Sequence, residues 1–267
     1  MATGPLLWLM LVFFVTSSVS VITGSTSLIT VPVMFQFGIE PRTAIATNMF
    51  ALIFLSIGGI LPFLRGKKTI ADRRRLTRLV LLTLAGSLLG ALLLLRVPQH
   101  SVSLIVSGAM IGVAIFSVVY RKSGTSEFMA PASTAAEFTG YALTFLLGIY
   151  GGFYSGGYVT ILTAVYVALF RQSFVEAVAT TKVINIFSSA IATIVFMSRH
   201  LIEYRLGWIL GITMFAGALL GARLSIRLGD RWVRRIFLTA VWALGLKALF
   251  FDVLPSVSPA EEHGGAH

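Results

Sequence analysis

Long apolar runs separated by short polar segments make up most of this chain. Six of the runs have the length of a membrane-spanning helix, which needs about 20 predominantly apolar residues. Lipid offers the backbone no hydrogen-bond partners, so only helices or a closed barrel can span it, and barrel strands are about 10 alternating residues long. The pattern therefore predicts an all-α polytopic membrane protein. The six expected spans are Ala44–Leu64, Leu76–Leu95, Val102–Tyr120, Phe174–Met197, Leu206–Ser225 and Ile236–Leu254.

Two further apolar stretches, Pro5–Phe37 and Phe138–Phe170, are equal in length and are too long for one untilted helix. Small and polar residues interrupt both stretches at mid-length. We therefore expect each stretch to be broken into two short helices or to re-enter the membrane. The interruptions are Thr23-Gly24-Ser25-Thr26-Ser27, with Pro32 just beyond, and Gly148, Gly151, Gly152, Ser155, Gly156 and Gly157.

Short motifs recur at a nearly constant distance along the chain. Ala44-Ile45-Ala46-Thr47 matches Ala177-Val178-Ala179-Thr180, and Gly24 matches Gly157 at the same offset. Gly86-Ser87-Leu88-Leu89-Gly90-Ala91 matches Gly217-Ala218-Leu219-Leu220-Gly221-Ala222 at an almost identical offset. The small-xxx-small spacing of this second motif is typical of close helix packing, so we assign it no chemistry.

The matches predict two related halves, each with a broken or re-entrant first segment followed by three transmembrane helices. A polar segment rich in Ser, Thr and Ala lies between them and serves as the linker. The expected organisation is a first repeat at 1–120, a linker at 121–137, a second repeat at 138–255 and a flexible tail at 256–267.

Basic residues cluster at different places in the two halves. The first cluster follows the second apolar segment, and the second comes one segment later in its own half. Because positive loops stay in the cytoplasm, we predict that the halves are inverted-topology repeats. Each broken stretch then either enters and leaves on one side or crosses as two short helices. The clusters are Arg65, Lys67, Lys68, Arg73, Arg74, Arg75 and Arg78, and Arg223, Arg227, Arg231, Arg234 and Arg235.

Composition limits the environment and the partners. Only 12% of the 267 residues are charged, about half of the roughly 25% usual in soluble proteins. The net charge of +11 sits in short loops, which suits anionic lipid headgroups rather than nucleic acid. We expect a multi-pass protein of the inner (plasma) membrane, with both termini outside and Met1–Trp8 beginning the first membrane segment. The absence of cysteine excludes disulfides and thiolate metal sites.

Inverted repeats with helices interrupted at mid-membrane are typical of secondary transporters. The N-terminal end of a broken helix exposes amide groups that hold an anion without a buried charge. Glycine allows the backbone to approach the ligand, and hydroxyls add hydrogen-bond donors. Close packing remains the alternative role for the small residues. The candidate ligands here are Gly24, Ser25 and Thr26 in the first interruption and Tyr154, Ser155, Gly156 and Gly157 in the second.

Lys182 is a lone charge in an otherwise apolar span. A buried ammonium in a membrane costs about 3 kcal/mol or more, so it is usually retained for a purpose such as neutralising an anionic substrate. Snorkelling to the nearby interface is the alternative. Further polar candidates in the same pair of spans are Thr47, Asn48, Thr180 and Asn185, and Tyr150, Tyr154 and Tyr158 are candidates either to line a pore or to pack.

No carboxylate lies deep in any expected span, because Glu40 and Glu176 precede the second segment of each half. Proton coupling through an intramembrane acid is therefore weakly supported, and coupling to H⁺ or Na⁺ stays open. We expect no cofactor, a small anionic substrate, and no nucleic-acid partner; the sequence does not define the oligomeric state.

Three motifs are each present twice between about Val12 and Leu249: the Gly-rich break, the Ala-x-Ala-Thr motif and the Gly-x-x-x-Gly-Ala motif. This pattern resembles the TauE/SafE family of sulfite exporters and organosulfonate permeases. The resemblance implies transport of sulfite, sulfonates or related sulfur-containing anions. The family carries a proline after the glycine-rich stretch in each half. Pro32 fits this pattern, whereas Val165 stands at the matching position of the second half.

Two other classes of protein deserve comparison. An intramembrane serine protease with Gly-x-Ser-Gly would need glycine where Phe153 stands, and the four histidines lie in loops, at membrane edges or in the tail. We therefore do not expect an enzyme. An anion channel remains the alternative to a transporter.

Overall fold

The computed structural model describes residues 3–24, 26–64, 72–98, 101–102, 104–109, 112 and 133–247. The regular structure of these residues is helical, with no strand among them. The helices are α1 (Thr3–Thr23), α2 (Ser27–Gln36), α3 (Pro41–Leu64), α4 (Arg73–Arg96), α6 (Thr134–Phe153), α7 (Tyr158–Phe170), α8 (Phe174–Met197) and α9 (Tyr204–Lys247).

Five helices in the described part of the chain are long and apolar enough to cross a membrane: α1, α3, α4, α8 and the Tyr204–Leu228 part of α9. Each of α3, α4 and α8 has 24 residues, or about 36 Å, which exceeds the roughly 30 Å hydrocarbon core of a bilayer. The prediction of an all-α chain with several membrane-spanning helices is confirmed.

Helix α9 differs from its prediction. Separate spans were expected at Leu206–Ser225 and Ile236–Leu254, but one helix runs without a loop from Tyr204 to Lys247. The sequence between the expected spans is rich in Arg and contains Leu and Ile but no proline, so nothing in it stops a helix. Helix therefore replaces the loop expected between the two spans.

Other expected boundaries fall near or outside the described residues. Helix α6 begins at Thr134, within the stretch 121–137 expected as a linker, because Ser133 caps it by accepting a hydrogen bond from Ala136 N at 3.2 Å. The expected span Val102–Tyr120 lies largely outside the described residues, and the tail 256–267 lies entirely outside them.

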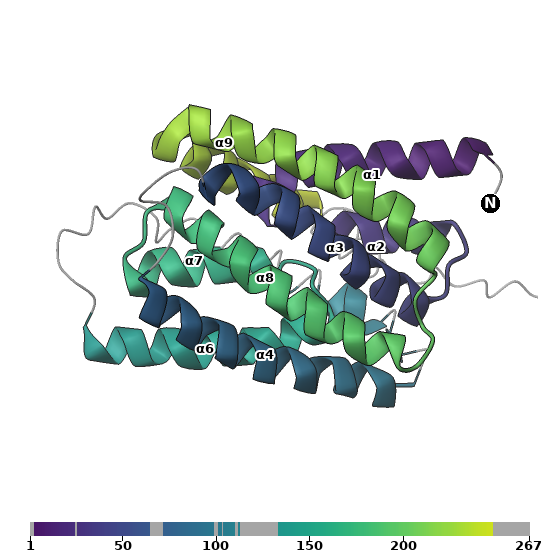
Figure 1. Ribbon diagram of the computed structural model, residues 1–267, viewed down its shortest axis with the longest axis horizontal. Coiled ribbons are helices and arrows are strands. Elements are labelled where there is room, and N and C mark those ends of the chain that lie inside the picture. Colours follow the sequence, from purple (N-terminus) through teal and green to yellow (C-terminus); the bar gives the residue numbers. More distant parts are fainter. Residues whose placement is uncertain are drawn as a thin grey trace, which may run out of the picture.

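The helices form a bundle with two outer pairs and a central pair. Figure 1 shows α1 beside α9 along one edge and α6 beside α4 along the opposite edge, with α3 and α8 between them. The short helices α2 and α7 pack against α3 and α8, respectively. Each outer pair therefore joins the first helix of one half to a late helix of the other half.

Glycines allow the two helices of each outer pair to approach each other closely. A Cβ added at Gly90 of α4 would lie 1.9 Å from the Ile149 carbonyl oxygen of α6, and one at Gly221 of α9 would lie 2.0 Å from the Ser18 carbonyl oxygen of α1. The packing role predicted for these motifs is confirmed. Ile149 and Ser18 are themselves separated by the same offset as Gly90 and Gly221, so the matched motifs make matched contacts.

Different contacts mark the two ends of the bundle. At one end, called the Arg75 end, Arg75 of α4 forms an ion pair with Glu137 of α6 and lies over the ring of Phe170, the last residue of α7. At the other end, called the Glu203 end, Glu203 lines a cavity with Leu6 of α1 and Ile39, which follows α2. The start of α1 and the end of α2 thus lie at the Glu203 end, so this helix pair opens toward that end. The start of α6 and the end of α7 lie at the Arg75 end, so the second pair opens toward the opposite end.

Candidate functional site

The junction between α1 and α2 turns at a glycine. Gly24 has φ +73°, a left-handed conformation that glycine adopts without strain. Its amide donates a hydrogen bond of 2.7 Å to the Ser20 carbonyl, which closes the last turn of α1. The amides of Ile29 and Thr30 then donate to the Thr26 carbonyl at the start of α2. Ser25, a predicted ligand in this junction, lies outside the described residues.

The junction between α6 and α7 is built in a related way. The Tyr154 amide closes α6 by donating to the Tyr150 carbonyl at 2.7 Å, and Gly157, with φ +78°, precedes α7. The Tyr150 hydroxyl donates to the Gly156 carbonyl, which holds the turn. A Cβ on Gly156 would lie 2.3 Å from the Tyr154 ring, so glycine serves close packing at this position.

The two junctions lie against each other. Tyr154 donates from its hydroxyl to the Ser27 carbonyl at 3.0 Å, and Thr160 donates to the Thr23 carbonyl at 2.6 Å. A Cβ on Gly24 would lie 2.7 Å from the backbone nitrogen of Thr160. Residues from opposite halves of the chain therefore form one buried polar centre.

Asn48 of α3 holds α2 in place. Its Nδ2 donates to Ser27 Oγ at 2.9 Å, and its Oδ1 accepts from Thr30 Oγ1 at 2.8 Å. The matching residues of the second half, Thr163 and Thr181, also meet, at 3.5 Å. Asn48 thus lies beside the junction, but its amide already has protein partners.

Lys182 is buried beside the first junction. Its side chain is 1% exposed and passes Gly59 of α3, where an added Cβ would lie 3.4 Å from Lys182 Cδ. Nζ donates to the Ser20 carbonyl at 3.3 Å, in the last turn of α1, where the helix dipole favours a cation. No described carboxylate forms an ion pair with Nζ. The ammonium points into the protein and does not snorkel to an interface.

The remaining predicted residues divide into two groups. Asn185 donates to Ser56 Oγ at 2.7 Å, whereas its Oδ1 and the Thr180 hydroxyl are buried without a hydrogen-bond partner. Thr47 lies elsewhere, because its hydroxyl accepts from the Glu203 amide at 3.0 Å. The structure therefore leaves Thr47 out of the polar centre.

A family model described as "Sulfite exporter TauE/SafE" matches residues 9–248. The chain belongs to the TauE/SafE family. The match spans both junctions and Lys182, and it confirms the resemblance carried by the repeated motifs.

Curated relatives of this TauE/SafE chain are named only as probable membrane transporters. ORF9 from Sinorhizobium sp is 25% identical over 248 residues, covering 91% of this chain and 92% of its own length. YfcA from Escherichia coli K12 is 25% identical and covers 86% of this chain and 84% of its own length. A relative from Haemophilus influenzae is 26% identical and covers 80% and 81%, respectively. No solved structure matches the chain significantly.

Sequence reasoning named Lys182 and Asn185 but missed the rest of a polar stripe on α8 of this TauE/SafE protein. Ser188 Oγ lies 2.7 Å from Ser87 Oγ of α4, which also donates to the Gly148 carbonyl of α6 at 3.1 Å. The Tyr158 hydroxyl lies near those of Thr83 and Ser188. Helical spacing of polar residues would have revealed the stripe, which contains Thr181, Lys182, Asn185, Ser188, Ser189 and Thr193.

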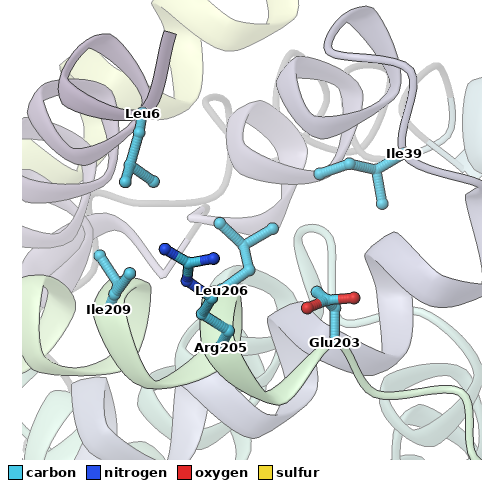
Figure 2. Close-up of a pocket in the computed structure, with 6 residues that line it drawn as sticks. All are labelled: Leu6, Ile39, Glu203, Arg205, Leu206 and Ile209. Carbon is cyan, nitrogen blue, oxygen red and sulfur yellow. The ribbon is translucent and has the colours of Figure 1, made fainter. Parts of the chain in front are cut away.

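A cavity of about 320 Å³ opens at the Glu203 end, away from the polar centre. Figure 2 shows the Arg205 guanidinium extending into it between Leu6 and Leu206. None of the predicted ligands that the structure describes lines this cavity. The described residues contain no cluster of three His, Cys, Asp or Glu side chains that could hold a metal ion.

Proposed function

We propose that this TauE/SafE membrane transporter carries a small anion, with sulfite or a sulfonate as the expected substrate class. The observation that carries the proposal is the buried side-chain amino group of Lys182, which has no carboxylate partner among the described residues. A bound oxyanion supplies the missing negative charge and so offsets the cost of holding the cation inside a membrane.

The surroundings of Lys182 suit a small oxyanion. The first junction places the N-terminal end of α2 near the last turn of α1, to which Lys182 donates. Amides at a helix N-terminus favour negative charge.

We further propose that the two halves are inverted-topology repeats that alternate access to the polar centre. The matched glycine contacts of α4 with α6 and of α9 with α1 support this arrangement. So does the opening of the α1–α2 and α6–α7 helix pairs toward opposite ends of the bundle. In such folds the substrate site lies at the interface of the repeats.

The distribution of basic residues favours one orientation of the protein in the membrane. The residues that precede and begin α4 are strongly basic, which favours the Arg75 end on the cytoplasmic side of the plasma membrane. The Glu203 end and the beginning of α1 then face outward.

Uptake into proteoliposomes tests the function. Sulfite, thiosulfate, taurine, sulfoacetate and sulfate are offered to the parent protein and to Lys182→Met. We expect saturable, concentrative uptake of at least one anion by the parent and its loss in the variant. Flux that neither saturates nor concentrates would indicate a channel, and absence of flux for every anion would contradict the proposal.

A further inference from the structure

A second cavity, of about 470 Å³, lies at the Glu203 end between α3, α4 and the segment after α8. Among the described residues that line it, every charged side chain is basic and the others are leucines. The lining consists of Arg42, Arg96 and Arg199 together with Leu92, Leu95 and Leu201. The cavity therefore combines a cationic and an apolar surface.

The three arginines stand where the membrane meets water. Arg42 is the second residue of α3, Arg96 is the last residue of α4, and Arg199 follows the end of α8 by two positions. Because these helices are longer than the hydrocarbon core is thick, their ends reach the lipid headgroups. Leu92, one turn deeper on α4, is 43% exposed.

The arginines keep unused hydrogen-bonding capacity. Arg42 donates through Nη2 to the Val97 carbonyl, which anchors its guanidinium, while its Nε is buried with no partner. None of the three forms an ion pair with a described carboxylate, in contrast to Arg75, which pairs with Glu137. A cluster of guanidinium groups without counter-charges is suited to binding an oxyanion.

We propose that this cavity binds the phosphate of an anionic phospholipid, with an acyl chain along Leu92 and Leu95. A free oxyanion would gain charge-assisted hydrogen bonds but nothing from the leucines, whereas a lipid uses both surfaces. The site is separate from the polar centre around Lys182 and does not depend on which anion is transported.

Thermal unfolding in a neutral detergent tests the site, with phosphatidylglycerol, phosphatidylcholine or inorganic phosphate added. Phosphatidylglycerol should stabilise the parent more than the other two additives. In the double variant Arg96→Gln and Arg199→Gln, half-maximal stabilisation should need at least about tenfold more phosphatidylglycerol, since each arginine contributes several-fold to about tenfold near a lipid surface. Both side chains are exposed, so the variant should unfold normally without lipid.

A matched control removes the same charge elsewhere. Arg205→Gln with Arg223→Gln takes two exposed arginines from α9, and Lys182→Met tests the polar centre. Both controls should keep the phosphatidylglycerol response of the parent. An equal loss in the α9 control, equal stabilisation by phosphatidylcholine, or stabilisation by inorganic phosphate alone would overturn the lipid assignment.

Discussion

Lys182 and Met49 occupy matching positions of the two halves, on α8 and α3, and both are buried. The two matched positions therefore hold an amine in one case and a thioether in the other. An ammonium is not needed to build this kind of helix contact. Under the proposed function, its burial next to the Ser20 carbonyl serves anion binding.

Replacing Lys182 with Met, the residue of the other half, should separate binding from stability. We expect anion affinity to fall at least about tenfold, because an ion contact is lost. Thermal stability should stay equal or rise, because replacing a buried charge by an apolar residue of similar volume is often neutral or stabilising. Anion-dependent unfolding measures both quantities, with Lys182→Arg as the charge-conserving control. Unchanged affinity for every anion that stabilises the parent would refute the role.

Asn48 allows a prediction about structure alone. Asn48→Leu removes hydrogen bonds to Ser27 and Thr30 and should lower the free energy of unfolding by about 1–2 kcal/mol. Thr181→Val, which removes the longer 3.5 Å contact with Thr163, should cost less. Thermal unfolding of the two variants compares them, and an equal or reversed order would show that Asn48 does not hold α2.

At the scale of elements, the glycine contacts decide how closely the outer helix pairs approach. In an exposed helix, replacing glycine by alanine stabilises by roughly 1 kcal/mol. At Gly90 and Gly221 the added methyl group would meet a carbonyl oxygen at 1.9 Å and 2.0 Å, respectively, so the helices would have to separate.

Gly90→Ala and Gly221→Ala should therefore each destabilise the protein, by about 1–3 kcal/mol, as overpacked cores do. Gly4→Ala is the matched control, because nothing lies within 4 Å of its added Cβ. Unfolding midpoints in detergent should fall for the first two variants and not for the third. A rise at Gly90 or Gly221 would mean that the helices are more loosely packed than described.

Element boundaries were predictable where local chemistry marks them. Both ends of α8 coincide with the prediction, and a capping box of Ser173 and Glu176 marks its start. The continuous α9 was missed, because a basic segment without proline was read as a loop. The contact of Tyr154 with Ser27 was also beyond prediction, since spacing along a chain does not tell which breaks meet in space.

At the scale of the whole molecule, the α1–α2 pair has its free ends at one end of the bundle and the α6–α7 pair has them at the other. The chain contains no cysteine, so single cysteines introduced on either side can be labelled without background. Gln36 at the end of α2 and Thr139 in the second turn of α6 are both exposed. They mark the Glu203 end and the Arg75 end, respectively.

A membrane-impermeant maleimide applied to intact cells should label Gln36→Cys directly and Thr139→Cys only after permeabilisation. The physical reason is the basic region at the Arg75 end, which favours the cytoplasm. Arg74→Cys should behave like Thr139→Cys as a positional control. Labelling of both test cysteines from the same side would contradict the inverted arrangement of the halves.

The direct contact between the junctions has a mechanical consequence. Thr160 and Tyr154 donate hydrogen bonds to the backbone of the α1–α2 pair. A shift of the α6–α7 pair would therefore displace the α1–α2 pair or break these bonds. Under the proposed alternating access, a displacement of one pair would be transmitted to the other pair through these hydrogen bonds at the centre. Opening on one side and closing on the other would then be coupled without a long-range relay through the bundle.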